Sequence, residues 1–205
     1  MKKEVNPRDT DRKEAFELWM KSPMPMVTLT KTFDVSHIYK ISKRKTLKFN
    51  MLLCWCIGKA ASGIKEFYLL PEQGKLYKYD RLAVNVIVMN KVGGLSSCDI
   101  PYTDDLEQFN ADYQTLTQSA FVSCENTFVK DAMVIGTSAM PTTELDCVVN
   151  QYTDLFCNPM VMWGKYRKEW FKVLLPISFQ FHHTQMDGSQ ATWFLKELQN
   201  TINTI

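Results

Sequence analysis

The sequence predicts a single domain of α/β or α+β class, in which helices cover a large mixed β-sheet. The 205 residues are 45% hydrophobic, which is enough to bury a sizeable core. Helical patterns fall mostly in the first two thirds of the chain, and strand patterns crowd the last third. No internal repeat, low-complexity tract or Gly/Ser-rich linker divides the chain, so we expect residues 1–205 to form one domain.

A short helix opens the chain. The pattern predicts a helix through Arg12 and Trp19, capped by Asp9 or Thr10 and ended by Pro23. This arrangement places Arg12 in the first turn of the helix.

A strand and a buried helix come next. Residues 26–33 alternate in character and are rich in β-branched side chains, as is typical of a strand. Asp34 or Ser36 is expected to cap the helix that follows. Residues 49–64 are apolar at helical spacing on nearly every side, which predicts a helix buried in the core.

Strand patterns dominate the remainder of the chain, together with two amphipathic helices. Strands are expected at residues 76–80, 82–89, 95–97, 132–137, 145–149, 160–166 and 170–182. Helices are expected at residues 104–121 and from Gly188 or Ser189 to residue 202, the second with Trp193, Phe194, Leu195 and Leu198 on its inner side.

The charge and hydropathy patterns argue against two classes of partner. The chain has 24 basic and 22 acidic side chains, so it lacks the strong positive charge of nucleic-acid-binding proteins. The basic cluster at residues 40–48 is interpreted as a solvated helix end, in preference to a patch that contacts the phosphates of a nucleotide-bearing cofactor. No apolar run is long enough to span a bilayer, so no membrane partner is expected.

The six cysteines indicate a reducing compartment. They are irregularly spaced in a chain too long to need disulfides, and Cys54 and Cys56 fall within an apolar helical pattern typical of core residues. The N-terminus has no apolar stretch of the kind that forms a secretory signal. A cytoplasmic location is therefore expected.

Two of the three histidines, His182 and His183, stand together at the end of the last predicted strand. Successive strand side chains point to opposite faces, so at most one of them serves a site. His183 is the better candidate, because it lies where the chain leaves the sheet and an imidazole suits proton transfer. Asp187 is placed to orient that imidazole or to be neutralised by an arginine. The alternative is a purely structural pair bonded to backbone carbonyls; a metal site is disfavoured because only His37 remains as a third imidazole.

The run His182-His183-x-x-x-Asp187-Gly188 resembles the His-His-x-x-x-Asp-Gly signature of the chloramphenicol acetyltransferases, a trimeric family of CoA-dependent acyltransferases. Other segments agree in order and in approximate spacing: Leu174–Gln180, Gly164–Tyr166, Phe156 with Pro159, Ser138-Ala139-x-Pro141 and Arg12–Phe16. The resemblance covers almost the whole chain. It implies an α/β fold, a two-layer sandwich with a large mixed β-sheet covered by helices.

The resemblance implies a role for three residues of the motif. His183 takes the position of the general base, which removes the proton of the acceptor hydroxyl so that its oxygen attacks the thioester of acetyl-CoA directly. Asp187 and Arg12 take the positions of an ion pair that holds the loop and the imidazole and transfers no proton. A bidentate Arg–carboxylate pair suits this role, because the planar guanidinium fixes direction as well as charge.

Two positions depart from the family pattern. Cys147 stands where the family has a serine that hydrogen-bonds the oxyanion, and a thiol is a weaker donor than a hydroxyl. Met162 stands where the family has a threonine that helps to bind solvent in the transition state. A nucleophilic role for Cys147 in an acyl-enzyme route ranks below simple substitution, because nothing in the sequence indicates an activated thiol.

The resemblance also implies the ligands: acetyl-CoA as co-substrate, a small hydroxyl-bearing acceptor, and no metal. Met24, Met26 and Val27 fall on the segment that contacts the drug in the family, but this segment lacks the aromatic or cysteine side chains usual there. An acceptor other than chloramphenicol is therefore a second possibility. Trp163 and Tyr166 are expected near CoA.

The leading hypothesis is an O-acetyltransferase that acts on chloramphenicol or a similar acceptor, assembled as a homotrimer with active sites between subunits. The alternative from another class is a trimeric ligand-binding or sensor protein of the same fold with weakened catalysis, motivated by Cys147 and Met162. A dihydrolipoyl acyltransferase core is disfavoured, because the sequence shows no lipoyl domain or flexible linker.

Overall fold

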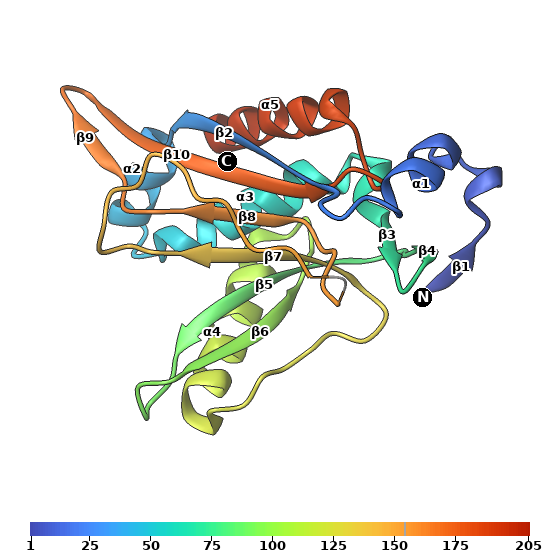
Figure 1. Ribbon diagram of the computed structural model, residues 1–205. Helices are drawn as coiled ribbons and strands as arrows, with labels where there is room; N and C mark the ends of the chain where they lie inside the picture. Colours follow the sequence, from blue (N-terminus) through green and yellow to red (C-terminus); the bar gives the residue numbers. More distant parts are fainter. Residues whose placement is uncertain (154) are drawn as a thin grey trace.

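A seven-stranded mixed β-sheet forms the centre of the protein (Figure 1). The structure is a computed structural model that describes residues 1–153 and 155–205. The strands of this sheet are β2 (Met26–Asp34), β5 (Leu82–Met89), β6 (Leu95–Pro101), β7 (Met133–Ala139), β8 (Met160–Trp163), β9 (Arg167–Glu169) and β10 (Lys172–His182). Their order is β2-β10-β8-β7-β5-β6, with β9 paired to β10.

The sheet contains both parallel and antiparallel pairs. β10 pairs antiparallel with β2, β8 and β9, and β5 pairs antiparallel with β6. β7 runs parallel to both of its neighbours, β5 and β8. A smaller antiparallel sheet beside it consists of β1 (Lys3–Val5), β4 (Lys75–Lys78) and β3 (Leu69–Glu72).

Helices cover one face of the large sheet (Figure 1). They are α2 (Ser36–Arg44), α3 (Phe49–Ser62), α4 (Leu106–Ser123) and α5 (Gly188–Thr204), and the short α1 (Lys13–Trp19) lies at the end of β10. Two 3-10 helices, η1 (Pro7–Asp9) and η2 (Lys65–Tyr68), complete the set. The arrangement confirms the predicted α/β two-layer class with a large mixed sheet.

Side-chain alternation along β10 separates the core from the helix-free face. Phe179 points toward the helices, where its ring lies 4.6 Å from that of Phe194 on α5. Ser178 and Gln180 point the other way, and the Ser178 hydroxyl lies 2.8 Å from that of Thr30 on β2. The long segment between β7 and β8 crosses this helix-free face, where Gln180 donates to the Asn150 carbonyl over 3.1 Å.

Several local predictions were wrong. Residues 145–149 are not a strand, because β7 pairs directly with β8 and leaves no place for another strand between them. Trp193 is 52% exposed, because it lies about 100° around α5 from Phe194 and therefore off the buried stripe. Neither Asp9 nor Thr10 caps α1; its N-cap residue is Arg12, whose backbone N–H donates to the Thr10 hydroxyl over 3.1 Å.

No helix in the described part of the chain is long and apolar enough to cross a membrane.

Candidate active site

The two histidines have different surroundings, as strand alternation predicts. His182, the last residue of β10, is 1% exposed, and its Nδ1 accepts a hydrogen bond of 3.1 Å from the backbone N–H of Thr184. His183 is the first residue beyond β10, and its backbone N–H donates to the Pro25 carbonyl over 2.8 Å. Its side chain keeps 27% of its surface exposed. Of the pair, His183 is therefore the one that a substrate can reach.

Trp19 on α1 holds the His183 ring by stacking. The two ring centroids lie 4.4 Å apart and the planes differ by 7°. Stacking on the indole fixes the orientation of the imidazole, and the face of an indole also attracts cations. The sequence pattern placed Trp19 on a helix but assigned it no role, since nothing in the local pattern connects residue 19 with residue 183.

Asp187 lies close to the same imidazole. Its Oδ1 is 3.2 Å from His183 Nδ1, but the two groups are not aligned as a hydrogen bond, and Nδ1 is a buried nitrogen with no hydrogen-bond partner among the described residues. We infer that Asp187 acts on the ring through its charge. Because Nδ1 is enclosed, Nε2 is the ring nitrogen that an acceptor can approach.

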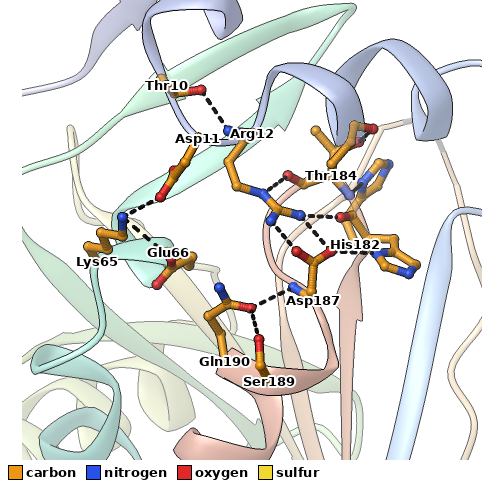
Figure 2. A network of polar contacts seen from close by, with 12 residues as sticks. Thr10, Asp11, Arg12, Lys65, Glu66, His182, Thr184, Asp187, Ser189 and Gln190 are labelled. Atoms are coloured by element: carbon orange, nitrogen blue, oxygen red, sulfur yellow. Dashed lines mark hydrogen bonds and ion pairs between the residues drawn. The ribbon is translucent and has the colours of Figure 1, made fainter.

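Arg12 ties the loop together (Figure 2). Its side chain is 4% exposed, and its guanidinium donates to Asp187 Oδ2 and, over 3.0 Å, to Oδ1. It also donates to the carbonyls of His183 over 2.8 Å and of Thr184 over 3.0 Å. A single planar cation therefore fixes both the carboxylate and the backbone that carries the candidate base.

The helix start reinforces this geometry. Asp187 is the N-cap of α5, and its backbone N–H donates to Gln190 Oε1 over 3.1 Å in a capping box. The carboxylate of Asp187 thus lies where a helix N-terminus also favours negative charge.

Asp187 should make stability depend on pH. The hydrogen bond from Arg12 lowers the pKa of Asp187, partial burial opposes this, and the charge of Arg12 adds to the lowering. A depressed folded-state pKa gives stability that is present above the unfolded pKa of about 4 and lost as the pH falls through the folded-state value. We expect the difference in unfolding free energy between the wild type and Asp187→Asn to be larger at about pH 5 than at about pH 2, because it shrinks once the pH falls below about 4. Denaturant unfolding across this range measures it, and a difference that does not change with pH would contradict the ion pair.

Cys147 and Met162 form a second cluster, around Ser178. Cys147 is exposed, and the backbone N–H of the adjacent Val148 donates to the Ser178 hydroxyl over 2.9 Å. Met162 on β8 lies directly opposite Ser178 and is 2% exposed. Five residues of extended backbone separate Ser178 from His183, so the two clusters lie roughly 16 Å apart within one chain. A single chain does not bring Cys147 and Met162 together with His183.

The segment that carries Cys147 is held against the residues that follow β8. A Cβ atom at Gly164 would lie 2.6 Å from the carbonyl oxygen of Thr143, so only glycine allows this close approach. The backbone N–H of Lys165 donates to the same carbonyl over 2.7 Å. Arg167 at the start of β9 adds an ion pair of 2.6 Å with Asp146.

The predicted acceptor segment divides between two faces. Met26 lies opposite His182 in the sheet and lines a cavity of about 140 Å³ together with Gln180. Val27 packs against the core, and Met24 is half exposed. Because strand residues alternate, the side chains of Met26 and Val27 point to opposite faces of the sheet.

The two predicted CoA neighbours also differ in exposure. Trp163 is 2% exposed within the core and offers no surface to a ligand. Tyr166 is partly exposed. Its ring centroid lies 5.2 Å from that of Tyr39 on α2 and 5.4 Å from that of Phe49 on α3. The ammonium group of Lys168 lies 5.1 Å from the centre of the Tyr39 ring, so basic side chains border this aromatic cluster.

Within residues 1–153 and 155–205, no group of three or more His, Cys, Asp and Glu side chains is arranged to hold a metal ion.

Comparison with known proteins identifies relatives over the whole length. A family model described as chloramphenicol acetyltransferase matches residues 3–199. The chain is 26% identical over 199 residues to chloramphenicol acetyltransferase 3 of Escherichia coli, covering 94% of this chain and 92% of that protein. It is 26% identical over 198 residues to the chloramphenicol acetyltransferase of Bacillus pumilus, covering 92% of this chain and 88% of that protein.

Solved structures agree in fold. A chloramphenicol acetyltransferase superposes with a TM-score of 0.81 at 18% identity, covering 98% of this chain and 100% of its own. A probable dihydrolipoamide acetyltransferase of Listeria monocytogenes superposes with a TM-score of 0.72 at 9% identity, covering 98% and 93%. Since the family model spans nearly the entire sequence, the chain belongs to the chloramphenicol acetyltransferase family and is an acetyltransferase.

Proposed function

We propose that this protein transfers the acetyl group of acetyl-CoA directly to a hydroxyl group of chloramphenicol or of a similar small acceptor, with His183 as general base. The observation that carries the proposal is the surroundings of His183: a reachable imidazole stacked on Trp19, beside a carboxylate that Arg12 holds. Family membership supports the acetyl donor, and the names of the relatives support the acceptor.

Because Nδ1 of His183 is enclosed, Nε2 is the atom that takes part in proton transfer. Nε2 accepts the proton of the acceptor hydroxyl while the oxygen attacks the thioester carbon. The tetrahedral intermediate then collapses, the C–S bond breaks, and the imidazolium returns the proton to the departing CoA thiolate. Trp19 and Asp187 stabilise the imidazolium between these two steps, through the ring face and through charge respectively.

The separation of the two clusters supports a homotrimer with sites between subunits. Cys147 and Met162 lie roughly 16 Å along the sheet from His183 in one chain, too far to contact the same reacting atoms. In the proposed trimer, His183 of one subunit meets the helix-free face of its neighbour, where the neighbour's Cys147 segment completes the site. The oxyanion donor at this position is then a thiol.

The aromatic cluster around Tyr166 is the proposed site for the nucleotide end of acetyl-CoA. Tyr166, Tyr39 and Phe49 supply ring faces suited to an adenine, and Lys43 lies 5.6 Å from the Tyr39 ring centre. Lys48 immediately precedes α3. We therefore assign the phosphate-binding role to the basic residues 40–48, for which the sequence pattern alone favoured a solvated helix end.

Removing two of these lysines should weaken CoA binding selectively. In a Lys43→Ala/Lys48→Ala variant we expect the KM for acetyl-CoA to rise several-fold, about what the loss of two exposed charge contacts produces. The KM for the acceptor and kcat should stay near wild type, and the effect should diminish at high salt. Steady-state kinetics with each substrate varied in turn measures this. Lys91→Ala, in the β5–β6 turn, is the matched control, and equal KM values for the two variants would contradict the assignment.

A panel of hydroxyl-bearing acceptors distinguishes acetyl transfer from the alternative, a ligand-binding or sensor role. Thiol release from acetyl-CoA should require a hydroxyl-bearing acceptor and should yield its O-acetyl ester. The rival, a binding or sensor protein with weakened catalysis, is motivated by the thiol at Cys147 and the methionine at Met162. Ligand binding by calorimetry without turnover of any acceptor in the panel would favour that rival.

A further inference from the structure

A cavity of about 290 Å³, which none of Arg12, Trp19, His183 and Asp187 lines, lies between the β3–β4 hairpin and residues 128–134 and 155–158. Its walls include the apolar side chains of Leu70 and Leu155 and the aromatic ring of Phe128, which is 74% exposed. Asp99 and Glu72 also line it, and none of the described lining residues is a lysine, arginine or histidine. The cavity is therefore partly apolar and lined by charge of one sign.

Asp99 places a buried negative charge in the wall of this cavity. It lies on β6 opposite Asn85 of β5 and is only 3% exposed. The Asn85 amide donates to Oδ1 over 2.7 Å, and the backbone N–H of Val129 donates to Oδ2 over 3.0 Å. Both oxygens therefore act as acceptors, but both donors are neutral. Among the described residues Asp99 takes part in no ion pair, so its charge is buried without a counter-ion.

Glu72, the second carboxylate of the wall, differs from Asp99 in this respect. It forms an ion pair with Lys2 and accepts a hydrogen bond from the Tyr79 hydroxyl. Its charge is thus already offset within the chain. An added cation is therefore expected to interact more favourably with Asp99 than with Glu72. Burying a carboxylate without a cationic partner is costly, and a charge-assisted hydrogen bond from the added cation offsets that cost.

We propose that this cavity binds a small organic cation, an ammonium group carried by an apolar or aromatic body, with Asp99 as its counter-ion. The ammonium lies against the Asp99 carboxylate, and the body packs between Leu70, Leu155 and the Phe128 ring. The face of that ring adds cation–π attraction. The cavity volume limits the ligand to a single small molecule. The proposal does not depend on acetyl transfer, because no residue of the His183 site takes part in it.

A pair of matched probes tests the site on the whole protein. By titration calorimetry, 2-phenylethylammonium should bind at least about tenfold more tightly than the neutral 2-phenylethanol, a charge-assisted hydrogen bond being the difference. Asp99→Asn should remove this preference, and His183→Ala should leave it unchanged. Equal binding of the two probes to the wild type would overturn the proposal.

A second variant keeps the test valid if Asp99→Asn fails to fold. Leu155 is 90% exposed at the rim, so its replacement is tolerated structurally. Leu155→Lys supplies a competing ammonium group and should weaken binding of 2-phenylethylammonium about tenfold or more. Leu155→Gln, a polar but neutral change, removes the same apolar contact without adding charge and should weaken binding clearly less than Leu155→Lys does. Identical affinities in these two variants would also overturn the proposal.

Discussion

Replacing His183 with alanine is expected to lower kcat for acetyl transfer by about 10²- to 10⁴-fold, the range typical of losing a general base. The neighbouring imidazole cannot take over, since His182 is buried and bonded to the Thr184 backbone. The fold should survive, because the His183 side chain is partly exposed and the Arg12 contacts to residue 183 involve its backbone. Thiol release with a saturating acceptor measures the loss.

His182→Asn is the matched control for this variant. An asparagine Oδ1 can occupy the place of His182 Nδ1 and keep the hydrogen bond from Thr184, so kcat should stay within about tenfold of wild type. The assigned mechanism fails if His183→Ala turns over at the wild-type rate.

Removing the Arg12 guanidinium is expected to lower both activity and stability. In Arg12→Met, the side-chain stem remains but four hydrogen bonds to the His183–Asp187 loop are lost. We expect a loss of about 2–3 kcal/mol in unfolding free energy, less than for a fully buried pair because Asp187 is 45% exposed. We expect kcat to fall about 10²-fold, because the imidazole loses its fixed position.

Arg12→Lys separates charge from geometry. A lysine restores the positive charge but not the planar fork that reaches the carboxylate and two carbonyls together. Denaturant unfolding and steady-state kinetics of both variants should therefore place Arg12→Lys between wild type and Arg12→Met. An Arg12→Met protein with wild-type kcat would show that the loop needs no such support.

Local patterns predicted most of the fold. The alternation at residues 26–33 and the apolar helix at residues 49–64 became β2 and α3, nearly to the residue. The strand prediction at 145–149 failed because apolar content does not reveal which strands pair with one another. Here β7 and β8 pair directly, so the segment between them in the sequence does not enter the sheet between them. β1, β3 and β9 are only three or four residues long, too short for a periodic signal.

The candidate site was predictable where a motif carried it. The family motif led to Arg12, His183 and Asp187, and the structure places these three together. The stacking of Trp19 on His183 and the pairing of Asn85 with Asp99 were not predictable, because each depends on contacts that the tertiary fold creates. Their sequence neighbourhoods contain no pattern that selects them.

The most direct test of the central claim is the release of CoA thiol from acetyl-CoA by the purified protein, with and without chloramphenicol, followed by identification of the product. We predict that release depends on chloramphenicol, that an O-acetyl ester forms in equal amount, and that His183→Ala slows both by about 10²- to 10⁴-fold. Binding of chloramphenicol without its acetylation would contradict chloramphenicol as the acceptor, and undiminished ester formation by His183→Ala would contradict His183 as the base.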